Sequence, residues 1–244
     1  MATRNEIAIG RALRQVYDAA TERAIATGDA VVSGEQAKRL IAALRMAWAR
    51  AARAATASTM RDVAAMEAKQ DLWQQFAEEY ARAYGGNAIT AILEATRAQI
   101  MEMIRAGLNE GLTLPEIAKR IREAVPGLAR RRAMVIARTE THSASVYASV
   151  RTAETQSRWP LEKEWVSVSD HRTRDFGEAD GVVDQGNHRV MNGVKARMSE
   201  HFMVPNKFGG FDMMMYPGET SAPAYQCVNC RCVLKFRRIG GFIA

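Results

Sequence analysis

The three cysteines of the chain, Cys227, Cys230 and Cys232, all lie within six residues, in the stretch YQCVNCRCVLKF. Clustered thiols serve as metal ligands, as redox groups or as small apolar residues of a buried strand. The N-terminal residues carry scattered charges and no apolar core, so no secretory signal is expected, and the thiols do not indicate a disulfide framework. The cluster is therefore the first candidate site.

Zinc is the metal that this spacing suggests, because Cys-x-x-Cys-x-Cys offers three of the four ligands that zinc needs. The histidines considered for the fourth position are His201, His188 and His171. Against zinc, Cys230 and Cys232 fall two residues apart on a predicted strand, which would separate their side chains by about 7 Å. Sulfurs on one tetrahedral zinc lie about 3.8 Å apart. We therefore expect buried free cysteines and no cofactor, with zinc on Cys227, Cys230, Cys232 and His201 as the alternative.

Catalytic chemistry is not indicated elsewhere in the sequence. It contains no nucleophile elbow, phosphate loop or paired-carboxylate motif. An acidic loop lacks the regular spacing of a calcium loop, so its members are expected to be solvated turn residues: Asp170, Asp175, Glu178, Asp180 and Asp184. The expectation is that the chain is not an enzyme.

Good helix formers dominate the chain up to about residue 155. Apolar spacing predicts helices over about 3–27, 34–84, 88–107, 114–126 and 128–156. Ser33 with Gln36, and Thr113 with Glu116, have the spacing of capping boxes. The sequence YGGN at 84–87 predicts a turn, and Pro126-Gly127 predicts a helix end.

The later residues are rich in Gly, Pro, Asn, Val and aromatics, as is typical of strands and turns. A strand is predicted over about 162–169, and Cys230, Cys232, Leu234 and Phe236 alternate as one face of a closing strand. The predicted fold class is α+β, with a long-helix N-terminal half and a small module of a helix packed on a short antiparallel sheet. The predicted domains are residues 1–107 and 108–244.

The order of motifs from about 108 to 236 is similar to that of one known family. GLTLPEIAKRIRE is followed by RAMVIARTET, WVSVSD, DHRTR, DG, PGE and NCRC. This order resembles the phage Mu protein F-like family of minor head, or head morphogenesis, proteins. The positions that carry the family's pattern are Arg138, Thr139, Glu140, Asp170, Arg174, Gly181, Pro217, Gly218, Asn229, Cys230, Arg231 and Cys232.

One motif of the family is incomplete here. The family usually has Arg-x-x-His in the loop before the glycine, whereas Gly177 stands three residues after Arg174. His171 lies on the other side of that arginine. Cys227 is also outside the family's pattern.

Arg138 and Glu140 are each predicted to tether their helix to the C-terminal sheet, with an exposed helical glutamate as the alternative for Glu140. Arg138 and Glu140 are two residues apart on a helix, so they point to different faces and cannot pair. A buried carboxylate needs a partner, and the cations proposed for it are Arg174 and Arg231.

The resemblance implies a structural protein of a tailed-phage or prophage virion, acting in head assembly inside the capsid near the portal, after synthesis in the host cytoplasm. A stripe of helical Met and aromatic residues is usually core, but any part that the small C-terminal domain leaves uncovered would be a partner surface, for which the resemblance implies the portal. Its members are Met46, Trp48, Met60, Met66, Trp73, Met101 and Met103. The net charge of +7 and the run Arg130–Arg132 leave contact with packaged DNA open. A carrier for a delivered effector is a further alternative, which the eight residues after Phe236 disfavour. No membrane span is expected.

Overall fold

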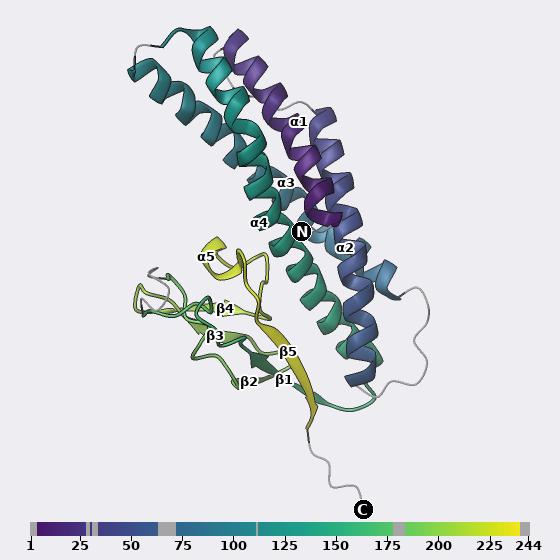
Figure 1. The fold of residues 1–244 in the computed structure, drawn as a ribbon. Coiled ribbons are helices and arrows are strands. Elements are labelled where there is room, and N and C mark those ends of the chain that lie inside the picture. The colour runs from purple at the N-terminus through teal and green to yellow at the C-terminus, as the bar shows by residue number, and fades with distance from the viewer. Residues whose placement is uncertain are drawn as a thin grey trace, which may run out of the picture. The chain divides into compact units, whose positions relative to one another are not determined.

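The structure is a computed structural model, and it describes residues 4–27, 30, 34–62, 72–110, 112–177 and 184–239. Its long helices are α1 (Arg4–Thr27), α2 (Gly34–Asp62), α3 (Leu72–Asn109) and α4 (Leu114–Gln156), followed by short strands (Figure 1). Contacts divide the chain into two compact units. We call Met1–Ala47 with Ala81–Ala137 the helical unit, and Trp48–Tyr80 with Arg138–Ala244 the mixed unit. The predicted division at residue 107 stays a prediction.

The helical unit buries apolar stripes from all four long helices. Leu13 and Val16 of α1, Leu44 of α2, Ile100 of α3 and Ile121 of α4 are almost fully buried. Among them lies a polar group centred on Arg132, whose Nη1 donates to Tyr17 Oη at 3.1 Å and to Thr96 Oγ1 at 3.2 Å. Arg132, one member of the predicted basic run, thus forms hydrogen bonds between helices, whereas Arg130 and Arg131 are exposed.

The mixed unit contains a three-stranded antiparallel sheet in the order β2-β1-β5, formed by β2 (Lys195–Arg197), β1 (Leu161–Val166) and β5 (Val233–Arg238). The C-terminal part of α4 packs on it: Val146, Val150 and Ala153 form one buried cluster with Leu161 and Phe236. The predicted α+β class, with a helix on a short antiparallel sheet, is confirmed. The predicted strand at 162–169 is observed over Leu161–Val166.

A second sheet is the hairpin of β3 (Phe202–Pro205) and β4 (Phe211–Met214). Its inner face contributes Phe202, Val204 and Met214 to a core that also holds Trp165 and the three cysteines. The short helix α5 (Ala224–Cys227) leads from this hairpin toward β5.

Two predicted helix ends are wrong. Helix α3 runs through YGGN without a turn, and α4 runs through Pro126. A helical glycine costs about 1 kcal/mol relative to alanine, an amount that packing can offset, and Gly85 is buried. Half of the predicted Thr113–Glu116 capping box is present: Glu116 Oε2 accepts from the Thr113 backbone N–H at 2.8 Å, while the Thr113 hydroxyl donates to that same oxygen at 2.6 Å. Ser33 and residues 63–71 of the predicted 34–84 helix lie outside the described residues.

The predicted apolar stripe on the helices is largely internal packing. Trp48 and Met60 are buried, Trp73, Met101 and Met103 are half-buried, and only Met46 of the described members is exposed; Met66 lies outside the description. In the described helices, none is long and apolar enough to cross a membrane.

Candidate functional site

Three distant segments of the family pattern meet at the turn Val228–Arg231, between α5 and β5. Asn229 has a left-handed backbone, with φ of 58°, so the chain reverses there after α5. The Asn229 backbone N–H donates to Thr139 Oγ1 of α4 at 3.0 Å. Arg174, from the loop after β1, donates to the carbonyl of Val228. The turn is therefore held from both the helix and the loop.

Asp170 and Arg231 form the charged contact at this turn. Arg231 donates to both carboxylate oxygens of Asp170, with Nη1 to Oδ2 at 2.6 Å. These hydrogen bonds hold the pKa of Asp170 well below its usual range. Two residues that lie 61 positions apart are thus joined in bidentate geometry, which orients both side chains.

Glu140 is buried, but the proposed cation partners are wrong. Arg231 binds Asp170 and Arg174 binds Val228, whereas Glu140 Oε2 accepts from the Trp48 indole Nε1–H at 3.0 Å. Burial raises the pKa of Glu140 to about 7, although the Trp48 hydrogen bond acts in the opposite direction. Glu140 thus tethers α4 to α2 rather than to the sheet. Arg138 is exposed.

The cysteine cluster takes a form that the sequence did not predict. Cys230 and Cys232 precede β5, and the bend at Asn229 brings each sulfur to 3.6 Å from Nδ1 of His188. The three donor atoms lie within 4.8 Å of one another. The predicted separation of about 7 Å is therefore wrong, because it assumed an extended strand through both cysteines. Cys230, Cys232 and Phe236 are buried as predicted, but the two cysteines precede β5 and are not on its face.

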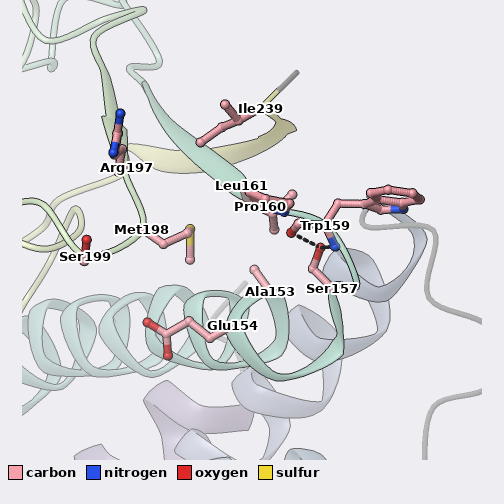
Figure 2. A pocket seen from close by; sticks show the side chains of 10 residues that line it. All are labelled: Ala153, Glu154, Ser157, Trp159, Pro160, Leu161, Arg197, Met198, Ser199 and Ile239. Atoms are coloured by element: carbon pink, nitrogen blue, oxygen red, sulfur yellow. Dashed lines mark hydrogen bonds between the residues drawn. The ribbon is translucent and has the colours of Figure 1, made fainter. Parts of the chain in front are cut away.

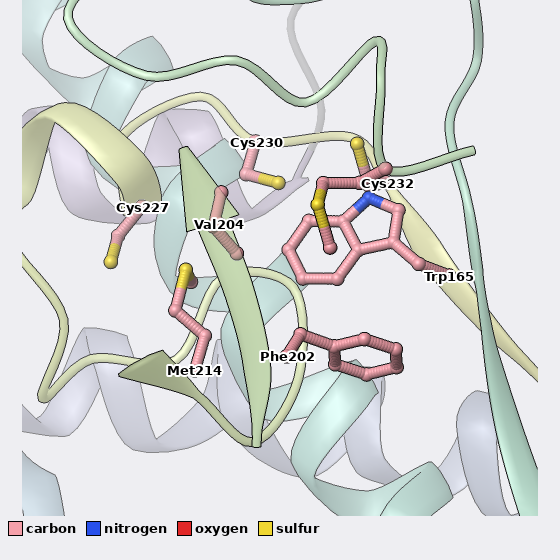
Figure 3. Close-up of a cluster of buried hydrophobic side chains, with 8 residues drawn as sticks. Trp165, Phe202, Val204, Met214, Cys227, Cys230 and Cys232 are labelled. Carbon is pink, nitrogen blue, oxygen red and sulfur yellow. The ribbon is translucent and has the colours of Figure 1, made fainter. Parts of the chain in front are cut away.

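Cys227 and His201 do not belong to this group. The Cys227 sulfur donates to the backbone carbonyls of Glu219 at 2.7 Å and Ala222 at 3.4 Å. Burial raises the pKa of its thiol to about 12. His201 is exposed, as is His171. Figure 3 shows Cys227 apart from the Cys230–Cys232 pair. The alternative zinc set with Cys227 and His201 is wrong in those two members.

A chain of hydrogen bonds, of which the one to Gln226 is buried, orients His188. Its Nε2 lies 2.9 Å from Oε1 of Gln226, and the Gln226 Nε2 donates to Asp212 Oδ2 at 2.7 Å. The Tyr225 hydroxyl also donates to that carboxylate oxygen, at 2.9 Å. Gln226 is fully buried on α5 and fits only because Gly186 has no side chain: a Cβ there would lie 2.0 Å from Gln226 Oε1.

The two sulfurs differ in their proton affinity. The neighbouring Cys230 thiol lowers the pKa of Cys232. The same contact, together with burial, raises the pKa of Cys230.

Pro217 and Gly218, also from the family pattern, are buried against α4. Gly218 has φ of 75°, and a Cβ there would lie 2.6 Å from Cδ2 of His142. Within the described residues, Nε2 of His142 is buried without a hydrogen-bond partner, and burial lowers the pKa of His142 to about 4. The glycine is required both by its backbone conformation and by this close approach.

The described part of the mixed unit has concave features on two sides. One lies between the end of α4 and the sheet, lined by Ala153, Trp159, Leu161, Met198 and Ile239 among others (Figure 2). The other is small, with room for roughly one water molecule. It reaches His188 and Cys232 and is bordered by Arg172, Arg174 and Arg231.

The remaining predicted residues lie in the acidic loop, and four residues of the site were not predicted. Gly181, Glu178 and Asp180 lie outside the described residues, while Asp175 and Asp184 lie in the described parts of their loop. Gln226, Asp212, Gly186 and His142 were missed. The glycine could have been noticed as a position of close approach, but no spacing links the other three to the cysteines.

Comparison with known proteins identifies the class. The family described as Phage Mu protein F like protein matches residues 98–235, which is more than half of the chain. The chain belongs to this family, as its motifs predicted. Membership makes it a phage head morphogenesis protein. No curated protein and no solved structure matches the chain.

Proposed function

We propose that this chain is a minor head protein of a tailed phage or prophage, which acts in capsid assembly near the portal vertex, inside the virion. Family membership supports the head role. The proposed partners are the portal protein and other head proteins, met first in the host cytoplasm. The role that we propose is structural rather than catalytic, because the sequence contains no nucleophile elbow, phosphate loop or paired-carboxylate motif.

The β3–β4 hairpin supplies the observation that favours a protein partner. Met203 and Met213 are directly paired across its strands, and both are 55% exposed. Phe211 on the same side is 56% exposed, and Phe208 at the turn is 68% exposed. Side chains on the opposite side of the same strands fill the core. The hairpin is therefore apolar on both faces, and an exposed apolar patch of this kind marks an interaction surface.

A pull-down of the full chain with the portal and major capsid proteins encoded beside it tests this role. We expect the portal to be captured, and the Met203→Gln/Met213→Gln/Phe211→Gln variant to lose at least tenfold in affinity. Ile7→Gln, on α1, removes an apolar side chain that is 46% exposed and serves as the matched control. Equal losses in both variants, or no capture of any head protein, would contradict the proposal.

Contact with DNA is the second candidate, because the chain carries a net charge of +7 and Arg130 and Arg131 are exposed. A mobility-shift assay at increasing salt distinguishes it, since phosphate contacts weaken steeply with salt. A shift abolished by Arg130→Gln/Arg131→Gln would support DNA contact, and no shift at low salt would exclude it.

A further inference from the structure

The group of His188, Cys230 and Cys232 has the donor types of a metal site. Two sulfurs and one imidazole nitrogen converge from two separate segments, the loop before β2 and the turn before β5. All three residues are buried. Thiolate and imidazole donors in this combination favour a borderline-soft ion such as zinc over the hard cations that prefer oxygen.

The hydrogen-bond chain behind His188 determines which ring nitrogen carries the proton. The carboxylate of Asp212 only accepts, so the amide nitrogen of Gln226 faces Asp212 and its Oε1 faces His188. His188 Nε2 must then donate to Gln226. Nδ1 consequently presents its lone pair toward the sulfurs. Metal-binding histidines are held in this manner, with the second nitrogen donating to a buried acceptor.

The distances also suit one ion. A tetrahedral zinc with Zn–S of about 2.3 Å and Zn–N of about 2.0–2.1 Å places sulfur and nitrogen about 3.6 Å apart. Both sulfur-to-Nδ1 distances are 3.6 Å. Two thiolates would also balance the charge of a divalent ion, which matters in a buried place.

Cys227 shows what a packing cysteine looks like in the same core. It is as buried as the other two, but its thiol donates to two backbone carbonyls and faces no histidine. The Cys227 thiol thus has hydrogen-bond acceptors within the protein and needs no bound ligand. Cys230 and Cys232 differ from Cys227 because both sulfurs face His188 Nδ1, although Cys232 also lies 3.7 Å from Ser167 Oγ.

We propose that Nδ1 of His188 and the sulfurs of Cys230 and Cys232 bind one zinc ion, with a solvent ligand from the small pocket at the fourth position. This site goes beyond the proposed head role. It would join the loop that carries His188 to the turn that carries Arg231 and Asn229, so its occupancy would stabilise the turn at which the family motifs meet.

Metal titration of the full chain tests the site. The protein is reduced, freed of metal with a chelator, and titrated with Zn²⁺ and, separately, Co²⁺. We expect one equivalent per chain, and a cobalt spectrum with thiolate-to-metal charge-transfer absorption. X-ray absorption of the zinc form should show two sulfur neighbours, a measurement that needs no variant. The wild-type chain failing to bind zinc, or giving a shell without sulfur, would overturn the proposal.

Matched variants locate the ligands. His188→Ala and Cys232→Ala should each weaken zinc binding by more than about a hundredfold, which exceeds the loss from a supporting residue. Cys227→Ala and His201→Ala should leave affinity within about twofold, since these residues lie outside the group. Circular dichroism checks that each variant is folded. A loss in Cys227→Ala as large as in Cys232→Ala would contradict the assignment.

Discussion

Glu140 and His188 are both buried polar side chains of the mixed unit, and their surroundings differ sharply. Glu140 lies between helices and has one neutral donor, the indole of Trp48. His188 lies among loops and has a directed partner on each ring nitrogen. The helices around Glu140 present the Trp48 indole as its donor, whereas the loops around His188 direct a partner at each ring nitrogen. An ionised Glu140 would therefore be poorly compensated, whereas the partners of His188 fix the orientation of its ring.

The largest expected effect comes from removing the charge of Glu140. Its pKa is about 7 in the folded chain and 4.5 as the ordinary value, so the folded state holds the proton more tightly. The free energy of unfolding should therefore fall as the pH rises from 4.5 to 7, by about 3 kcal/mol in total. Glu140→Gln keeps an acceptor for Trp48 and removes this loss.

Urea unfolding of both proteins at several pH values measures the effect. At pH 8.5 the variant should be more stable by up to about 3 kcal/mol, and at pH 4 the two should agree closely. Parallel pH profiles for the two proteins would show that Glu140 does not titrate as a buried acid.

The burial of Glu140 was predictable from sequence, but its partner was not. Helical spacing placed it on a different face from Arg138, and the need of a buried carboxylate for a partner followed from its chemistry. The indole donor lies 92 residues away on another helix, a pairing that no local pattern encodes. The family's motifs likewise predicted which segments matter, without predicting that they meet at Asn229.

The buried lysine of β1, Lys163, is a second case in which the sequence predicts burial but not the partner. In LEKEWV, Leu161, Lys163 and Trp165 share one face by strand alternation, and all three are buried. Strand alternation thus predicts the burial of Lys163, although lysine side chains are normally exposed. Only the structure supplies the reason: Lys163 Nζ donates to the carbonyl of Met215 at 2.8 Å and of Met198 at 3.2 Å.

The cysteines show where local reasoning fails. Alternation correctly predicted that Cys230 and Cys232 are buried, but the positive φ of Asn229 and the bend around it were not visible in the pattern. His188 became a neighbour through the long loop after β1, held there by its own backbone contacts to Arg174. The group of His188, Cys230 and Cys232 comes from loops distant in sequence, so its members cannot be predicted from local spacing.

A smaller effect should come from disturbing the support of His188. In Gly186→Ala the new Cβ would overlap Gln226 Oε1, and the fully buried Gln226 has no exposed position to take. We expect a loss of about 2 kcal/mol of stability from overpacking and a loss of about tenfold or more in zinc affinity.

Calorimetric zinc titration and urea unfolding of the variant test this. Gly127→Ala is the control, because its Cβ would meet only Arg131 Nη1 at 3.9 Å and it lies inside α4. The control should be equally or more stable, by up to about 1 kcal/mol, with unchanged zinc affinity. Unaltered zinc affinity in Gly186→Ala would mean that Gln226 does not orient His188.

The smallest expected effect separates the hydrogen bond of Glu140 from the packing around it. Trp48→Phe removes the indole donor and some buried volume, and the volume loss costs the same at every pH. A hydrogen bond to a charged acceptor contributes about 1 kcal/mol more than one to a neutral acceptor. The variant should thus be more destabilised at pH 8.5, where Glu140 is ionised, than at pH 5, where it is protonated. Urea unfolding at the two pH values gives this difference directly. If the penalty is the same at both, the indole stabilises the helices by packing alone, and the contrast with the directed partners of His188 becomes sharper still.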